Sequence, residues 1–333
     1  MTAWTSEEEQ RRRRRRRILR GLVVGGAAIG VPALFNVAIA KQARRLSAAS
    51  WGRRHRYAWE LGDVAFQRLG EGDPPLVLLH SFGPGHDSIE WRDLAQTLGE
   101  RYQVFAPDLP GWGRSDRPAL DYDAELYIDF LIDFLIDLVR RRAVVVAAGL
   151  AGAYAAQVAI DRPELVRGLV LVTPLGIDLG SDEPDLKDAV IHRLLQLPVV
   201  GTSALNLYSS RRGIEHHLRE EVYADAGRVD PPLVDHYWKN AHEDGSRAAL
   251  AAYLSGYLNH RVGRALERLK LPTMLLWGRR SRHPAVESAD LWLRALPEAE
   301  LEIVEPAGAL PHAEAPAEVA ALVTRFADAL PPA

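Results

Sequence analysis

Short runs rich in valine and leucine alternate with longer helical segments from about residue 57 to the end of the chain. Such near-continuous apolar runs are typical of strands buried on both faces of a sheet, and the helices between them are the connections that parallel strands require. The expected strands are residues 74–80, 102–111, 143–148, 166–174, 271–278 and 299–306. The sequence therefore predicts an α/β fold, with a mostly parallel central sheet and helices on both faces.

The alternation is interrupted between residues 178 and 265, where helical segments follow one another. We predict that these residues form a helical cap, inserted between the first part of the core at 57–177 and its second part at 266–333. Residues 62–70 are expected to add an antiparallel edge hairpin. Ligands of such sheets bind outside the carboxyl ends of the strands, so the cap would cover the ligand site.

The first 17 residues form a charged tail, in which three glutamates at 7–9 precede seven consecutive arginines at 11–17. A block of like charges is solvated, so we expect the tail at 1–17 to be disordered. The whole chain nevertheless has a net charge of −3, and no aromatic platform accompanies the arginines. A nucleic-acid partner is therefore not expected, whereas anionic lipid headgroups would suit the arginines.

Residues 18–40 are predicted to form a membrane anchor, because 21–40 gives 20 residues without a charge. A helix of that length spans about 30 Å, which matches the apolar core of a bilayer. With the arginines held in the cytoplasm, the chain would be a single-pass membrane protein with a linker at 41–56. Two alternatives stay open: an export signal of the twin-arginine kind cleaved after 38–40, and a helix packed on the globular part or lying in the interface.

Cysteine is absent from the chain, which excludes disulfides, thiolate metal ligands and cysteine nucleophiles. The adjacent His216 and His217 lie in a charged helical segment and lack the further spacing of a metal site. We therefore expect neither a bound metal nor a cofactor.

Four motifs occur in the order that they have in one large enzyme family. They are LHSFGPG at 79–85, DLPGWGRSDRP at 108–118, LPTMLLWG at 271–278 and GALPHAEAPAEV at 308–319. In these motifs the chain resembles the α/β-hydrolases, over about residues 57–330. The resemblance implies the fold of that family, and for a working member it implies hydrolysis of esters, lipids or other apolar substrates.

The resemblance also assigns the three triad positions, and none of them holds the usual residue. The nucleophile position falls on Gly149, the acid position on Ser281 and the base position on Ala309. Glycine and alanine supply neither a nucleophilic oxygen nor a base. The resemblance therefore implies a non-catalytic pseudoenzyme, in which Gly149 takes up the positive φ of the turn without the strain of a side chain.

Backbone donors are what remains of such a site. The amides of Leu150 and of the Ser81–Phe82 loop match the groups that hold a carbonyl oxygen in the family. Together with their neighbours they form the predicted ligand-binding set His80, Ser81, Phe82, Gly149 and Leu150.

Three functions are compatible with these residues. The first is a membrane-associated pseudoenzyme that binds a small apolar ligand, a lipid or a partner protein. The second is a hydrolase of carboxylic esters or lipids with a relocated site, for which Ser81 and His312 are the fallback candidates. The third is a scaffolding subunit of a membrane complex. Two further histidines, His86 and His283, are expected at the surface.

Overall fold

The computed structural model describes residues 30–46, 51–177 and 185–331. The expected tail at 1–17 and the first part of the expected anchor at 18–40 lie outside these residues. Within the described part of the chain, no helix is long and apolar enough to cross a membrane.

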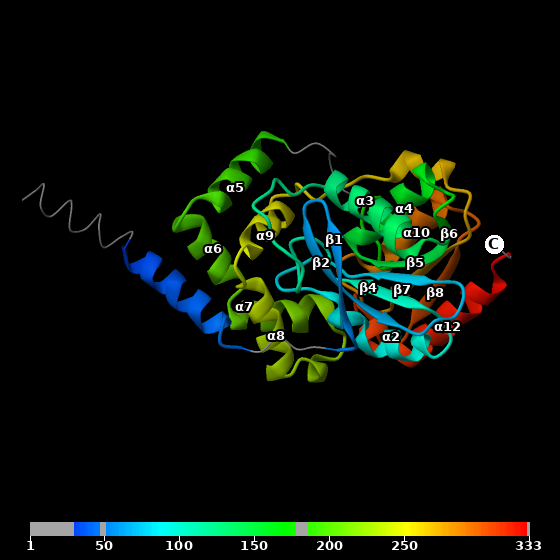
Figure 1. Ribbon diagram of the computed structural model, residues 1–333, viewed down its shortest axis with the longest axis horizontal. Helices are drawn as coiled ribbons and strands as arrows, with labels where there is room; N and C mark the ends of the chain where they lie inside the picture. The colour runs from blue at the N-terminus through cyan, green and yellow to red at the C-terminus, as the bar shows by residue number, and fades with distance from the viewer. Residues whose placement is uncertain (1–29, 47–50, 178–184, 332–333) are drawn as a thin grey trace, which may run out of the picture.

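The centre of the molecule is an eight-stranded sheet in the order β1-β2-β4-β3-β5-β6-β7-β8 (Figure 1). All neighbouring pairs from β4 to β8 are parallel, whereas β1 and β2 pair antiparallel at one edge. The predicted α/β fold and its edge hairpin are therefore confirmed. The strands are β1 Arg54–Trp59, β2 Gly62–Leu69, β3 Leu76–Leu79, β4 Val104–Pro107, β5 Ala143–Ala148, β6 Val166–Val172, β7 Thr273–Gly278 and β8 Glu300–Val304.

Helices cover both faces of the sheet, because the side chains of each strand alternate between two apolar clusters. In β5, Val145 belongs to the cluster under α3, α4 and α10, and Val144 belongs to the cluster under α2 and α12. These helices are α2 Arg92–Gly99, α3 Ala124–Asp133, α4 Leu150–Asp161, α10 Ala289–Ala295 and α12 Pro316–Ala329. Shorter helical segments are η1 Ser88–Trp91, η2 Phe134–Val139, η5 Gly263–Arg268, η6 Val286–Ser288 and α11 Pro311–Glu314.

The cap consists of helices inserted between β6 and β7, on one side of the sheet in Figure 1. Two of these helices begin at residues that are typical of helix N-termini. The side chain of Asp185 accepts the amide of Asp188 in a capping box, and Asp230 caps a helix whose first residue is Pro231. The cap elements are α5 Leu186–Gln196, α6 Val200–Tyr208, α7 Arg211–His217, η3 Leu218–Val222, η4 Ala226–Arg228, α8 Pro231–Ala241 and α9 Ser246–Leu254.

A helix at 30–43 lies against the cap, as the blue ribbon of Figure 1 shows. The side chain amide of Asn36 donates to the carbonyl of Val199 at 3.2 Å and to Ser203 Oγ at 3.1 Å. Ala43 is fully buried in an apolar cluster that it shares with cap residues. The helix therefore runs beyond residue 40, and β1 starts at Arg54, so both ends of the expected linker at 41–56 belong to regular elements.

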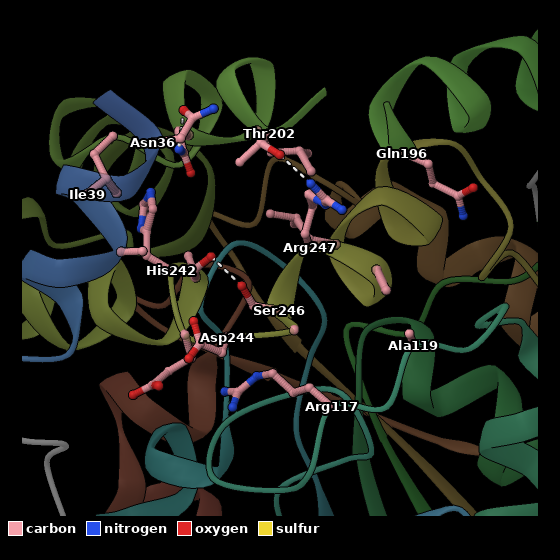
Figure 2. A pocket seen from close by; sticks show the side chains of 18 of the residues that line it. Asn36, Ile39, Arg117, Ala119, Gln196, Thr202, His242, Asp244, Ser246 and Arg247 are labelled. Atoms are coloured by element: carbon pink, nitrogen blue, oxygen red, sulfur yellow. Dashed lines mark hydrogen bonds between the residues drawn. The ribbon is translucent and has the colours of Figure 1, made fainter. Parts of the chain in front are cut away.

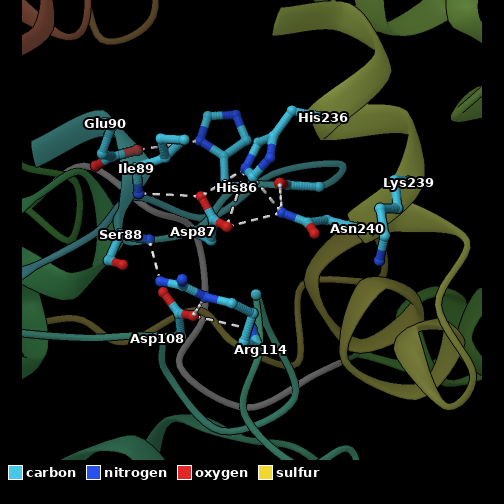
Figure 3. Close-up of polar contacts among 12 residues, drawn as sticks. His86, Asp87, Ser88, Ile89, Glu90, Asp108, Arg114, His236, Lys239 and Asn240 are labelled. Atoms are coloured by element: carbon cyan, nitrogen blue, oxygen red, sulfur yellow. Dashed lines mark hydrogen bonds and ion pairs between the residues drawn. The ribbon is translucent and has the colours of Figure 1, made fainter. Parts of the chain in front are cut away.

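A buried ion pair joins the cap to the core. His236 Nε2 of α8 lies 3.0 Å from a carboxylate oxygen of Asp87, and Asn240 Nδ2 donates to the same oxygen at 2.8 Å (Figure 3). Burial alone would lower the pKa of His236, but the charge of Asp87 and the hydrogen bond to it outweigh burial and raise this pKa. Asp87 therefore favours the charged form of His236, and the pair fixes α8 over the loop that follows β3.

Replacing Asp87 by alanine should destabilise the protein by about 3 kcal/mol, because it leaves the buried imidazole of His236 without its counter-charge. The measurement is the free energy of unfolding in urea. The matched control is Asp244→Ala, which breaks the exposed ion pair with Arg44 and should cost less than about 1 kcal/mol. Equal losses in the two variants would contradict the structural role of the buried pair.

Candidate functional site

The turn between β5 and α4 is the centre of the candidate site. Gly149 occupies its tip with φ 57° and ψ −126°, a conformation that only glycine adopts without strain. A Cβ added there would meet only Ser81 Cβ, at 3.7 Å. The turn therefore has room for a side chain, and the backbone keeps the conformation that such a side chain would occupy under strain.

The other two triad-equivalent positions follow β7 and β8. The hydroxyl of Ser281 donates to the carbonyl of Pro284 at 2.8 Å, and Ser281 is 6% exposed. The amide of Ala309 donates to the carbonyl of Val222 at 2.8 Å, at the end of η3. Ala309 and Gly149 line one cavity, whereas Ser281 is not among the residues that line it.

This cavity has a volume of about 150 Å³ and lies between the carboxyl ends of the strands and the cap. Pockets for whole drug-sized ligands usually measure about 300–1,000 Å³, whereas a cavity of about 150 Å³ can hold a benzene ring. It therefore suits a small ligand, or one end of a longer one. Its apolar wall includes Phe82, Leu150, Leu175, Val222, Tyr253 and Leu310.

Two backbone amides at this cavity are free to bind a ligand oxygen. Within the described ranges, neither Phe82 N–H nor Leu150 N–H donates a hydrogen bond. Leu150 is the first residue of α4, where a helix leaves its N–H groups unpaired and its dipole favours negative charge. The arrangement can hold a carbonyl or carboxylate oxygen.

A buried carboxylate lies behind the cavity. Ser81 Oγ donates to Glu90 Oε2 at 2.8 Å and also lies 2.8 Å from His86 Nδ1, and Ser81 N donates to Glu90 Oε1 at 2.8 Å. Burial would raise the pKa of Glu90, but His312 and His86 outweigh burial and hold this pKa below its usual range. Since Ser81 gives its proton to an ionised carboxylate, His86 Nδ1 is the donor in its contact with Ser81. Figure 3 shows His86 and Glu90, the latter in η1.

Two residues of the predicted site, His312 and His80, make contacts that stabilise the fold. His312 is fully buried, stacks on Trp91 with ring centroids 3.7 Å apart, and places Nε2 3.4 Å from Glu90 Oε1. It does not line the cavity, and it meets Ser81 only through Glu90. His80 Nε2 accepts the amide of Leu109 at 2.9 Å, and its Nδ1 donates to the carbonyl of Ser81 at 2.7 Å.

The expectation that His86 lies at the surface was wrong, because the cap covers it. His86 is 2% exposed, and its ring lies 5.0 Å from that of Tyr237 and 5.8 Å from that of His217. Both histidines line the cavity, and so does His283, which is exposed as expected. Among the described residues, no group of three or more His, Cys, Asp or Glu could hold a metal ion.

The sequence analysis missed the pair of His217 and Glu221. His217 Nδ1 lies 2.8 Å from Glu221 Oε2, and burial together with the nearby His86 lowers the pKa of His217 to about 4. The imidazole is therefore neutral at pH 7, with its Nδ1 proton directed at the carboxylate. The spacing of four residues along a helix was the available signal, but only the packing of the cap brings the pair to the cavity.

Comparisons with known proteins agree with this architecture. A model of the Alpha/beta hydrolase family matches residues 76–322. The uncharacterized protein Rv2715 of Mycobacterium tuberculosis is 30% identical over 287 residues, which make up 81% of this chain and 79% of the relative.

Two solved structures are similar over most of the molecule. A membrane phospholipase A, described as a bacterial virulence factor, has a TM-score of 0.66 and is 26% identical, with 94% of this chain and 98% of that chain covered. A serine hydrolase involved in carbazole degradation has a TM-score of 0.68 and covers 83% of this chain and 98% of that chain. It is 20% identical, so this second likeness shows the fold alone.

Lowering the pH from 6.5 to 4 should destabilise the protein through His217, whose pKa falls from 6.5 to about 4 on folding. In this window the unfolded chain binds the proton and the folded chain does not, so stability is lost as the pH falls, by up to about 3 kcal/mol from this group. The measurement is the free energy of urea unfolding at several pH values. His217→Gln should flatten this part of the profile.

The control for that profile is His216→Gln, which changes the exposed neighbour in the same helix. It should leave the pH dependence as in the natural protein. If both variants kept the pH dependence of the natural protein's unfolding free energy, burial of a neutral His217 would not be the cause of that dependence.

Proposed function

This chain belongs to the alpha/beta hydrolase family, and we propose that it is a non-catalytic, membrane-associated member that binds a small apolar ligand through a carbonyl or carboxylate oxygen. The observation that carries the proposal is the cavity beside Gly149 and Ala309, which combines two free backbone donors with the loss of the nucleophile and the base. The ligand would be a lipid, a fatty acid or a molecule of similar chemistry.

Loss of the three side chains removes the usual chemistry and leaves the binding. In a serine protease, removing the whole triad lowers the catalytic rate by about 10⁶. The remaining acceleration of about 10³–10⁴ over the reaction in water comes from oxyanion donors and binding. The corresponding donors here are the amides of Phe82 and Leu150. A site that keeps only these groups holds a carbonyl group without attacking it.

Three observations support association with a membrane. Residues 21–40 carry no charge and follow a run of arginines. The described part of that segment exposes large apolar side chains, with Val31 65%, Leu34 73% and Phe35 64% exposed. The similar phospholipase is described as a membrane protein, and the match with it covers 94% of this chain. We therefore propose that residues 18–40 anchor the chain.

Binding at the cavity is tested with octanoate and methyl octanoate, measured by calorimetry on the purified full chain. We expect saturable binding that Ala309→Phe weakens at least about tenfold, because the ring fills the small cavity next to Gly149. The matched control is Ala329→Phe at the exposed end of α12, away from the cavity, which should bind like the natural protein. Equal binding by all three proteins would place the ligand elsewhere.

One observation favours a second function, a hydrolase with a relocated site. Ser81 Oγ lies 2.8 Å from His86 Nδ1 at the wall of the same cavity, next to the free amides. A serine beside a histidine is the arrangement of an activated nucleophile. In this cluster, however, the hydroxyl already donates to Glu90, whose depressed pKa makes it a weak base. The contact therefore suits a structural hydrogen bond better than activation.

The two functions differ in ester hydrolysis, measured with short and medium p-nitrophenyl esters. The natural protein should be inert, whereas the variant Gly149→Ser, Ser281→Asp, Ala309→His should exceed it at least about tenfold, because the turn has room for the serine. Turnover by the natural protein that Ser81→Ala abolishes would establish the relocated site and overturn the non-catalytic proposal.

A further inference from the structure

A second and larger cavity, of about 590 Å³, lies between the N-terminal helix, the cap and the core (Figure 2). Its walls come from three parts of the chain that are distant in sequence. These are the helix at 30–43, cap residues between 196 and 250, and the loop at 117–121 that follows the DLPGWGRSDRP motif. Its volume lies within the usual range for ligand sites, and Gly149 and Ala309 do not line it.

Two guanidinium groups at this cavity have no carboxylate partner. No ion pair joins Arg117 or Arg247 to an acidic side chain within the described residues. Arg117 donates to the carbonyl of Gly113, and its Nε is buried without a hydrogen-bond partner in the described structure. Burial lowers the pKa of Arg117 despite the charge of Asp108. Arg247 donates to the hydroxyl of Thr202, and Figure 2 shows both arginines at the cavity.

The acidic residues of the wall are mostly engaged elsewhere. Glu243 pairs with Lys239, and Asp244 pairs with Arg44 at 2.7 Å. Asp121 is exposed, so water screens its charge. Asp108, Asp87 and Asp116 attract Arg117 without forming an ion pair with it. Both guanidinium groups therefore reach the cavity outside any ion pair of the described residues, and a guanidinium fork is suited to phosphate or carboxylate oxygens.

The wall also has an apolar part beside polar residues such as Asn36, Gln196 and His242, and this part continues toward the N-terminal helix. Ile39, Leu205 and Leu250 line the cavity, and the helix at 30–43 that carries Ile39 exposes Val31 and Leu34 on its surface. An apolar chain could therefore lie along the helix while its charged end reaches the arginines.

We propose that this cleft, which we call the anchor cleft, binds a single-chain amphiphile with an anionic headgroup. The headgroup contacts Arg117 and Arg247, and the chain lies against Ile39, Leu205 and Leu250. The carboxylate of a fatty acid and the phosphate of a lysophospholipid share this chemistry. Because the cleft is separate from the cavity at Gly149, its ligand is independent of the ligand proposed for that cavity.

The test uses the full chain in neutral phosphatidylcholine nanodiscs, with Ala309→Phe introduced to close the other cavity. Decanoate, decyl phosphate, decanol and inorganic phosphate are titrated by calorimetry, with empty nanodiscs subtracted. We expect one site for decanoate or decyl phosphate, binding at least about tenfold tighter than decanol, because hydrogen bonds to charged groups are among the strong ones. The tighter of the two anions identifies a carboxylate or a phosphate as the headgroup.

The arginines are tested by Arg247→Glu, which changes an exposed side chain and should weaken anion binding at least about tenfold. The matched control is Arg212→Glu, an exposed cap arginine that does not line the cleft and should bind like the parent. Arg117→Lys keeps the charge but not the fork, and should bind more weakly than the parent. Equal binding by Arg247→Glu and Arg212→Glu, decanol binding as tight as that of the anions, or tight binding of inorganic phosphate alone would overturn the proposal.

Discussion

The segment after β3, a loop followed by η1, carries two buried carboxylates on which the arrangement of core, cap and cavity depends. Asp87 holds His236 and Asn240 of α8, and three residues later Glu90 accepts both the amide and the hydroxyl of Ser81. A buried charge is tolerated only when it is paired and hydrogen-bonded, so each carboxylate fixes the position of its partners. Through them, this short segment determines where the cap lies and how the wall of the cavity is built.

The candidate site has a strand, a turn and a helix that position backbone donors at the cavity, and we propose that it lacks the side chains of a catalytic centre. Gly149 still has the positive φ of the turn, and Leu150 still begins a helix whose first amides are unpaired. The strand, turn and helix are needed for the packing of β5 and α4 in the core, so they persist whether or not a nucleophile is present. In our proposal the missing chemistry is that of single side chains, at the positions held here by Gly149, Ser281 and Ala309.

Much of the fold was predictable from local patterns. All six expected strands of the parallel part are present. Five of them are apolar runs buried on both faces, whereas β8 lies at the edge of the sheet and is only partly buried. The helix α2 was not predicted, since it has only 8 residues and its buried Leu94 and Leu98 form a single helical turn of periodicity. Of the predicted ligand-binding residues, Ser81, Phe82, Gly149 and Leu150 line the cavity, whereas His80 lies behind it.

The amino-acid sequence by itself determined the class of fold, the order of its elements and the lack of a reactive side chain at Gly149 and Ala309, because these follow from hydrophobic patterns and residue identity. Only the tertiary structure decided which polar residues meet. His86 and His217 are 131 positions apart (217 − 86) and come together because the cap folds over the loop after β3. Arg117 and Arg247 likewise reach one cleft from separate parts of the chain. Such meetings depend on long-range packing, which no local pattern in the chain records.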